Sequence, residues 1–150
     1  MKKLVFSFVS FLLFHSLIFL EAQSKGAIII ASLEGDVSIV NNETQTPVAA
    51  DQVKPGGLIF DGHTVKTGPT AKVVLLMSNG TVSTIKSNST VNIKEFTQEK
   101  FDPTKKKLSE MKGEPSSSKT EIDLEMGDMI LDVKKLNKRS SFNVQSPVGT

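Results

Sequence analysis

The chain has no cysteine, no tryptophan and no tyrosine, and it has only two histidines. The lack of cysteine excludes a disulfide framework, a thiol nucleophile and a lipidated cysteine anchor. Single-stranded nucleic acids stack on aromatic side chains, and the few that the chain has are phenylalanines, several of which lie before residue 20. We therefore expect no nucleic-acid partner.

Charge and reactive side chains are equally sparse. The formal net charge is +2, too small to gather nucleic acid through a general field. His63 stands alone beside Gly62, without the cluster of ligands that a metal site needs and without a nucleophile motif nearby. We expect a surface histidine in a turn there, no metal, no cofactor and no enzymatic activity.

The N-terminus has the order of an export signal. Lys2 and Lys3 form a short basic region, residues 4–20 are largely apolar, and small residues occur at Ala22 and Ser24. We expect residues 1–24 to be a signal peptide that is removed after Ser24, or after Ala22 as the second choice. A retained membrane anchor is the alternative, although the run is short for a bilayer crossing. No second apolar run of this length follows, so we expect no membrane span after removal of the signal, and a periplasmic or secreted protein.

The stretch 59–96 organises the rest of the chain. The apolar run 71–77 is too short for an ordinary helix, and Asn79-Gly80 separates it from the β-prone run 81–85. Asn-Gly between two such runs predicts a β-hairpin with a type I′ turn. Residues 90–93 then alternate between polar and apolar side chains, as a half-buried strand does.

Short β-prone runs separated by turn residues continue along the chain from residue 25. They are 27–33, 36–40, 58–60, 71–77, 81–85, 90–93, 120–126, 129–136 and 140–144. This pattern is typical of sandwiches, barrels and β-solenoids rather than of alternating strands and helices. It predicts one all-β domain over 25–150, with short strands and tight turns in a solenoid-like or sandwich-like arrangement.

Residues 97–120 differ in composition, because Lys, Glu, Ser, Thr and Pro dominate them. We expect a polar surface insertion with one short helix over 103–112. Asp102 would cap this helix, Pro103 would open it and Gly113 would end it. We also expect a flexible linker over 114–118.

Several of the turns and strands together resemble the FecR domain family. The resemblance covers roughly 35–150 and is carried by Val65-Lys66-Thr67-Gly68, Asn79-Gly80-Thr81 and Phe142-x-Val144-x-Ser146-Pro147-x-Gly149-Thr150. The family positions to which we assign structural turns are Gly62, Thr67, Gly68, Asn79, Gly80, Gly127, Pro147 and Gly149. The resemblance implies an all-β fold, and a further strand after Thr150 in a longer protein.

The resemblance also implies a role in signalling at the cell envelope. Typical members have a cytoplasmic anti-sigma segment, one membrane span and this domain in the periplasm. Only three residues precede the apolar run here, so we expect an exported, free-standing module without that segment. Its function would be to bind or sense another envelope protein, and the edge near Asn143 and Gln145 is the candidate binding site. The alternative is a structural or surface-attached domain of a longer exported protein.

Overall fold

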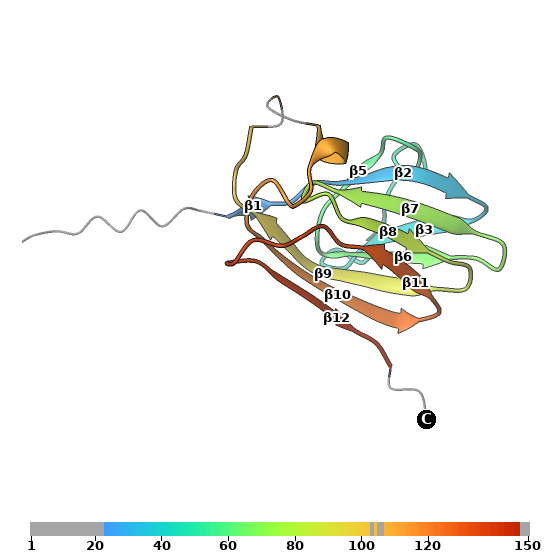
Figure 1. Ribbon diagram of the computed structural model, residues 1–150. Coiled ribbons are helices and arrows are strands. Elements are labelled where there is room, and N and C mark those ends of the chain that lie inside the picture. Colours follow the sequence, from blue (N-terminus) through green and yellow to red (C-terminus); the bar gives the residue numbers. More distant parts are fainter. Residues whose placement is uncertain (1–22, 103, 105–106, 148–150) are drawn as a thin grey trace, which may run out of the picture.

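The computed structural model describes residues 23–102, 104 and 107–147, which form two β-sheets (Figure 1). The larger, sheet A, has the strand order β12-β10-β9-β6-β3-β4, with β1 also pairing with β9. The smaller, sheet B, has the order β11-β8-β7-β2-β5. The all-β prediction is therefore confirmed. Of the expected signal peptide, residues 1–24, only Gln23 and Ser24 belong to the described residues.

The strands are short, as their spacing between turn residues predicts. In sheet A they are β1 Ser24–Lys25, β3 Val37–Asn41, β4 Thr46–Pro47, β6 His63–Thr67, β9 Thr90–Gln98, β10 Ser118–Met126 and β12 Ser141–Gln145. In sheet B they are β2 Ile28–Glu34, β5 Leu58–Ile59, β7 Lys72–Met77, β8 Val82–Ile85 and β11 Met129–Asp132.

One hydrophobic core fills the space between the two sheets. Buried side chains alternate with more exposed ones along β7 and β9, because neighbouring residues of a strand point to opposite faces. Sheet B contributes Ile28, Ile30, Ile59, Val73, Leu75, Met77 and Ile85, and sheet A contributes Ile39, Val65, Val91, Ile93, Phe96 and Ile122. A single core shared by two sheets makes this a β-sandwich, the second of the two arrangements that the sequence left open.

One passage of the chain, at one side of the sandwich, winds as in a β-solenoid. The chain passes from β10 in sheet A to β11 in sheet B and back to β12, which pairs in parallel with β10. Each of the other strand pairs of the two sheets is antiparallel, as in β7–β8 and β9–β10. A regular β-solenoid stacks its strands in parallel, so within the described residues only the passage from β10 through β11 to β12 winds in that way.

The β7–β8 hairpin occurs where Asn79-Gly80 predicts it, but its turn is of another type. The backbone N–H of Gly80 donates to the carbonyl of Met77 at 2.8 Å, and only Gly80 has a positive φ, of 87°. A type I′ turn needs positive φ at both central residues, so that prediction is wrong. The side-chain oxygen of Asn79 accepts from the N–H of Thr81 at 3.0 Å, which stabilises the observed geometry.

The segment between β9 and β10 is shorter and less helical than expected. β9 continues to Gln98 and β10 begins at Ser118, so both ends of the expected insertion 97–120 belong to the sheet. Within it, Leu108–Glu110 form a single 3-10 turn instead of a helix over 103–112. Asp102 accepts a hydrogen bond from the backbone N–H of Thr104 at 3.0 Å, and the Thr104 hydroxyl lowers the Asp102 pKa. Residues 103, 105 and 106 of the expected helix lie outside the described residues.

The expected flexible linker over 114–118 is also wrong. Glu114, Ser117 and Ser118 are buried. The N–H of Glu114 donates to the carbonyl of Lys135 at 3.0 Å, and Gly113 forms a parallel bridge with Lys135. The segment is held by the connection between β11 and β12, a contact that no local pattern in the sequence indicates.

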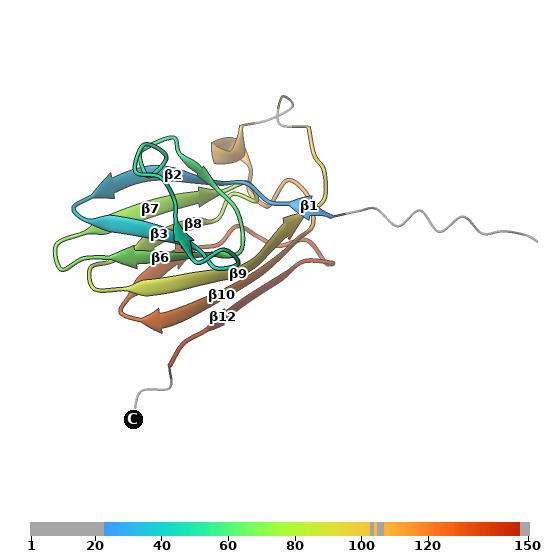
Figure 2. The same cartoon turned by 180° about the vertical axis from the view of Figure 1, so that it is seen from behind.

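The two ends of the described chain lie at opposite ends of the sandwich. β1 pairs with the last two residues of β9, and the chain enters there (Figure 1). β12 begins at that same end, beside the start of β10, and runs to the opposite end (Figure 2). We call these the β1 end and the C-terminal end of the sandwich.

Candidate functional site

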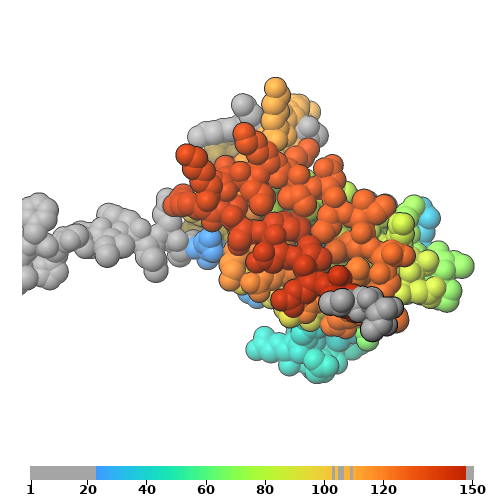
Figure 3. Space-filling model, turned by 60° about the horizontal axis from the view of Figure 1, so that its bottom comes forward, coloured from blue at the N-terminus to red at the C-terminus, as the bar shows by residue number. Residues whose placement is uncertain are grey.

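β12 is the edge strand of sheet A. It pairs with β10 from Lys119↔Ser141 to Asp123↔Gln145, and no further strand among the described residues pairs with its other side. Figure 3 shows this last part of the chain, in red, at the surface of the molecule. An edge strand presents backbone N–H and C=O groups to which an extended segment can pair.

The side chains of β12 divide between the two faces of the sheet. Phe142 packs against the hydrophobic core, whereas Val144, two residues further on, is 42% exposed. Asn143 and Gln145 lie on the other face, where they line a shallow depression of about 110 Å³ together with Lys94 and Asp123. The edge therefore offers amides on one face and an exposed apolar side chain on the other.

Ion pairs fix the charges beside this edge. Lys94 of β9 pairs with Asp123 of β10, and this hydrogen bond raises the pKa of the Lys94 ammonium. Lys119 pairs with Glu95 at 2.7 Å, and the Glu95 hydrogen bond likewise raises the Lys119 pKa. Both lysines stay charged at neutral pH, so this face offers ion pairs and amides for recognition.

Three of the family positions lie in or beside turns at the C-terminal end of the sandwich. The Thr67 hydroxyl donates to the carbonyl of Lys86 at 2.5 Å and accepts from the N–H of Ser89 at 3.0 Å. Gly68 donates its N–H to Asp36 at 2.9 Å. Gly127 has φ +89°, and its Cα lies so near Ser89 that a Cβ would come within 2.3 Å of the hydroxyl. These residues join turns of both sheets.

The other family positions are dispersed. Asn79 and Gly80 lie in the β7–β8 hairpin at the β1 end, where Asn79 is only 1% exposed. Gly62 lies in the turn before β6, and its N–H donates to the carbonyl of Ile93 at 2.8 Å. Pro147 is exposed just after β12, and Gly149 lies outside the described residues. The structure thus does not gather the family positions into one surface site.

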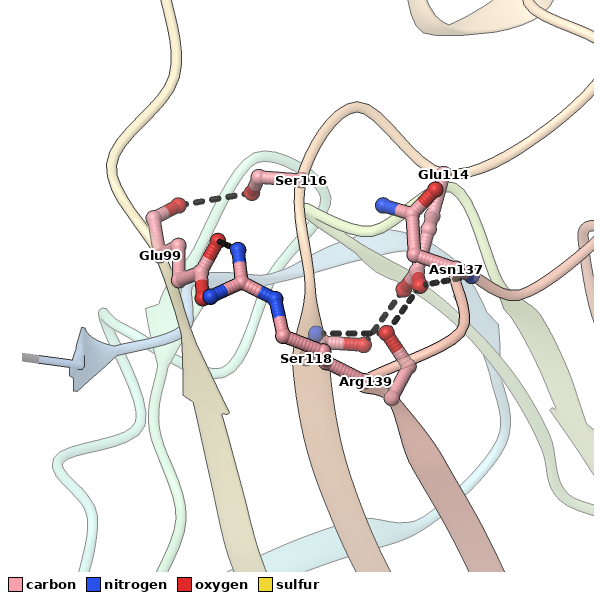
Figure 4. A network of polar contacts seen from close by, with 7 residues as sticks. Glu99, Glu114, Ser116, Ser118, Asn137 and Arg139 are labelled. Atoms are coloured by element: carbon pink, nitrogen blue, oxygen red, sulfur yellow. Dashed lines mark hydrogen bonds and ion pairs between the residues drawn. The ribbon is translucent and has the colours of Figure 1, made fainter. Parts of the chain in front are cut away.

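A buried carboxylate that the sequence did not indicate lies at the β1 end (Figure 4). Glu114 is 6% exposed and accepts from the N–H of Asn137 at 2.6 Å and from the Ser118 hydroxyl at 2.6 Å. It also pairs with the hydroxyl of Ser140. The Asn79 amide donates to the same Ser118 oxygen at 3.2 Å, so one carboxylate links the β7–β8 hairpin, β10 and the two long connections.

A second contact joins the same connections. Arg139 pairs with Glu99 at 3.1 Å, and the Ser116 hydroxyl donates to the carbonyl of Glu99 at 2.6 Å (Figure 4). The Glu114 carboxylate is the acceptor in all three of its hydrogen bonds, and this saturation of a buried carboxylate by donors indicates a structural role. We call Glu114 and its donors Ser118, Asn137 and Ser140 the clasp. No composition or motif signal marks Glu114, because it stands in a segment rich in Lys, Ser and Pro.

His63 is not in a surface turn but opens β6. It is partly buried, and its Nδ1 lies 3.1 Å from the carbonyl oxygen of Phe60. In the part of the chain that the structure describes, no three His, Cys, Asp or Glu side chains gather as they would around a metal ion. Among the helices of the described residues, none is long and apolar enough to cross a membrane.

Fold and site together define a mainly antiparallel β-sandwich domain in which β12 lies at one edge of sheet A among the described residues. The family model described as FecR protein matches residues 63–150, more than half of the chain, so the chain belongs to the FecR family. This is a regulatory family and not a family of enzymes. No curated protein and no solved structure matches the chain.

Proposed function

We propose that this protein is a non-catalytic binding or sensory module of the bacterial cell envelope. In this proposal residues 1–24 direct export, the sandwich works in the periplasm or at the cell surface, and its partner is another envelope protein. Membership of a regulatory family supports a signalling role, and the basic-then-apolar order of the N-terminus supports export.

The free edge of β12 is the observation that carries the proposal. A partner segment that pairs there gains backbone hydrogen bonds, and side chains on the two faces of β12 then give specificity. Val144 supplies exposed apolar surface on one face, and Asn143 and Gln145 supply amides on the other. The ion pair between Lys94 and Asp123 beside them sets a local charge pattern that a partner would have to match.

In-cell photo-crosslinking tests this assignment. A photoreactive amino acid replaces Asn143 or Gln145 in the full-length protein, and crosslinked products are identified by mass spectrometry. The matched control carries the same group at Thr46, which is exposed on β4, the strand at the opposite edge of sheet A.

The proposal expects one envelope protein to be crosslinked from both β12 positions and not from Thr46. Crosslinks from β12 that reach only other parts of the same chain would instead assign this edge to internal pairing. Equal capture of a protein from β12 and from β4 would show contact without a defined edge. Either of these results would overturn β12 as the partner site.

A further inference from the structure

The β1 end of the sandwich carries a concentration of basic side chains. They come from the β9–β10 connection, residues 99–117, and from the β11–β12 connection, residues 133–140. The described members are Lys100, Lys107, Lys112, Lys134, Lys135, Lys138 and Arg139. We call this group the basic end. Contacts between Gly113 and Lys135 and between Glu99 and Arg139 bring the two connections together.

The two connections carry fewer acidic than basic residues, which leaves them with a net positive charge. The acidic residues are Glu99, Asp102, Glu110 and Glu114. Glu114 is buried in its hydrogen-bond network, and Glu99 is paired with Arg139. Lys100, Lys107, Lys112, Lys135 and Lys138 are exposed, and none of them has an ion-pair partner within 4.0 Å among the described residues. Their charges face solvent.

The rest of the described chain has the opposite balance. Acidic residues outnumber basic ones there, with acids in the turns and strands of the C-terminal end such as Glu34, Asp36, Glu125 and Asp128. Among the described residues the excess of basic side chains is therefore confined to the basic end, although the whole chain has a net charge of only +2. Such a molecule orients in the field of an anionic surface with the basic end forward.

The chain enters the sandwich at the basic end. β1, residues Ser24–Lys25, pairs with β9 there, and the apolar run 4–20 precedes it in the sequence (Figure 1). A depression of about 370 Å³ lies beside β1 and is lined in part by Lys25, Gly26, Lys100 and Phe101. Its lining combines an aromatic residue with two lysines and Glu99, and the aromatic and basic residues suit the boundary between phosphate headgroups and apolar chains.

We propose that the basic end docks on an anionic lipid surface, with its lysines against the headgroup phosphates. Basic residues close to anionic lipids each contribute to binding over about one Debye length. The lack of Trp and Tyr disfavours nucleic acid as the anionic partner. Docked in this way, the sandwich holds its C-terminal end, and the end of β12, away from the lipid.

Vesicle sedimentation of the processed protein, purified without its apolar leader, tests the docking. One set of vesicles contains phosphatidylcholine alone, and the other contains equal parts of phosphatidylcholine and phosphatidylglycerol. The test variant replaces Lys112, Lys135 and Lys138 with Gln. The matched control replaces Lys54, Lys66 and Lys86, three exposed lysines outside the basic end, and so removes the same net charge.

The processed protein should prefer the anionic vesicles, and added salt should weaken this preference. The test variant should lose about tenfold or more in partition to them, and the control should keep most of its binding. Equal partition of the processed protein to both vesicles, or a preference that salt leaves unchanged, would overturn the proposal without any variant. Equal losses in the two variants would also overturn it, because net charge and not the basic end would then decide binding.

This docking does not rest on the proposed partner site at β12. A Val144→Lys substitution should leave vesicle binding unchanged, since it alters an edge residue near the opposite end of β12 from the basic end. Failure of the lipid experiment therefore leaves the crosslinking experiment intact, and the reverse also holds.

Discussion

The carboxylate of Glu114 accepts a hydrogen bond from the backbone N–H of Asn137 at 2.6 Å, across 23 residues of chain. This contact joins the two long connections at the β1 end of the sandwich. Because Glu114 also accepts from Ser118 and Ser140, three donors lose their partner if the carboxylate is removed. The stability of this end of the molecule therefore depends on one buried acidic group.

Substituting Glu114→Gln should destabilise the fold by about 2 kcal/mol, because hydrogen bonds to a charged group contribute more than neutral ones and the Gln amide turns an N–H₂ toward donors. Urea unfolding followed by circular dichroism measures the change. The matched control is Glu110→Gln, at an exposed position of the same segment, which should change stability by less than about 0.5 kcal/mol. Equal effects in the two variants would contradict the structural role of Glu114.

The same clasp decides which part of the β9–β10 connection can be removed. Deleting 105–117 with a Gly-Ser bridge takes out Glu114 and the buried Ser117, so we expect a marked loss of stability. A deletion of 102–110 with the same bridge keeps Glu114 and should retain the β-sheet circular dichroism spectrum and a cooperative transition. Equal thermal midpoints for the two deletions would show that the clasp contributes little.

Alanine substitutions at Gly127 and Gly62 distinguish the cost of a steric clash from the cost of backbone strain. Both glycines have positive φ, 89° and 74°, but a Cβ at Gly127 would come within 2.3 Å of the Ser89 hydroxyl, whereas a Cβ at Gly62 would meet nothing within 4 Å. Gly62→Ala should cost about 1 kcal/mol from strain alone. Gly127→Ala should cost at least about 2 kcal/mol more than that, because backbone near Ser89 must move. Urea midpoints that agree for the two variants would exclude the steric contribution.

We predict processing after Ala22, the second choice from the sequence, because residues 23 and 24 make contacts within the folded domain. The Gln23 side-chain oxygen accepts from the Thr97 hydroxyl at 2.9 Å, and the Ser24 hydroxyl donates to the carbonyl of Gln98 at 3.2 Å. Cleavage after Ser24 would remove both contacts and half of β1. Intact-mass analysis of the protein from the envelope fraction should therefore show a chain that begins at Gln23. A mass that begins at Lys25, or one that retains residues 1–22, would contradict this choice.

Local pattern predicted most strands because each is short and bounded by turn residues. The run 71–77 is β7 within one residue, and Asn79-Gly80 lies in a hairpin turn as expected. The strand β6, His63–Thr67, was not identified separately, since its polar residues Thr64 and Thr67 are buried through hydrogen bonds to other elements. Its position depends on pairing with β3 and β9, which local sequence does not encode.

Glu114 could not be identified from the sequence because its burial depends on hydrogen bonds to distant residues. Glu114 stands in a segment whose composition indicates a solvated loop, yet its carboxylate is buried because donors from Asn137, Ser118 and Ser140 converge on it. Those donors come from residues up to 26 positions away. The edge at Asn143 and Gln145 was inferred from the β pattern of the last residues, and β12 does lie at the edge of sheet A. Its use by a partner stays a prediction.

The last prediction tests that edge by adding a charge to it. Lysine on an edge strand opposes pairing with another chain, because the ammonium has to be desolvated when a partner strand covers it. Val144 is 42% exposed on β12, and Leu58 is 51% exposed on β5, one of the two edge strands of sheet B. Val144→Lys and Leu58→Lys therefore place the same group on two edges with little change in buried apolar surface.

The free energies of unfolding of both variants should lie within about 0.5 kcal/mol of that of the unaltered protein, as expected for exposed positions. In cells, Val144→Lys should lower the yield of the intermolecular crosslink from Gln145 at least about fivefold, which corresponds to about 1 kcal/mol of lost binding free energy. Leu58→Lys should leave that yield unchanged. If the two substitutions lower the yield equally, or if Val144→Lys has no effect while Leu58→Lys abolishes the crosslink, the partner does not pair along β12, and the edge of sheet B at β5 becomes the surface to probe.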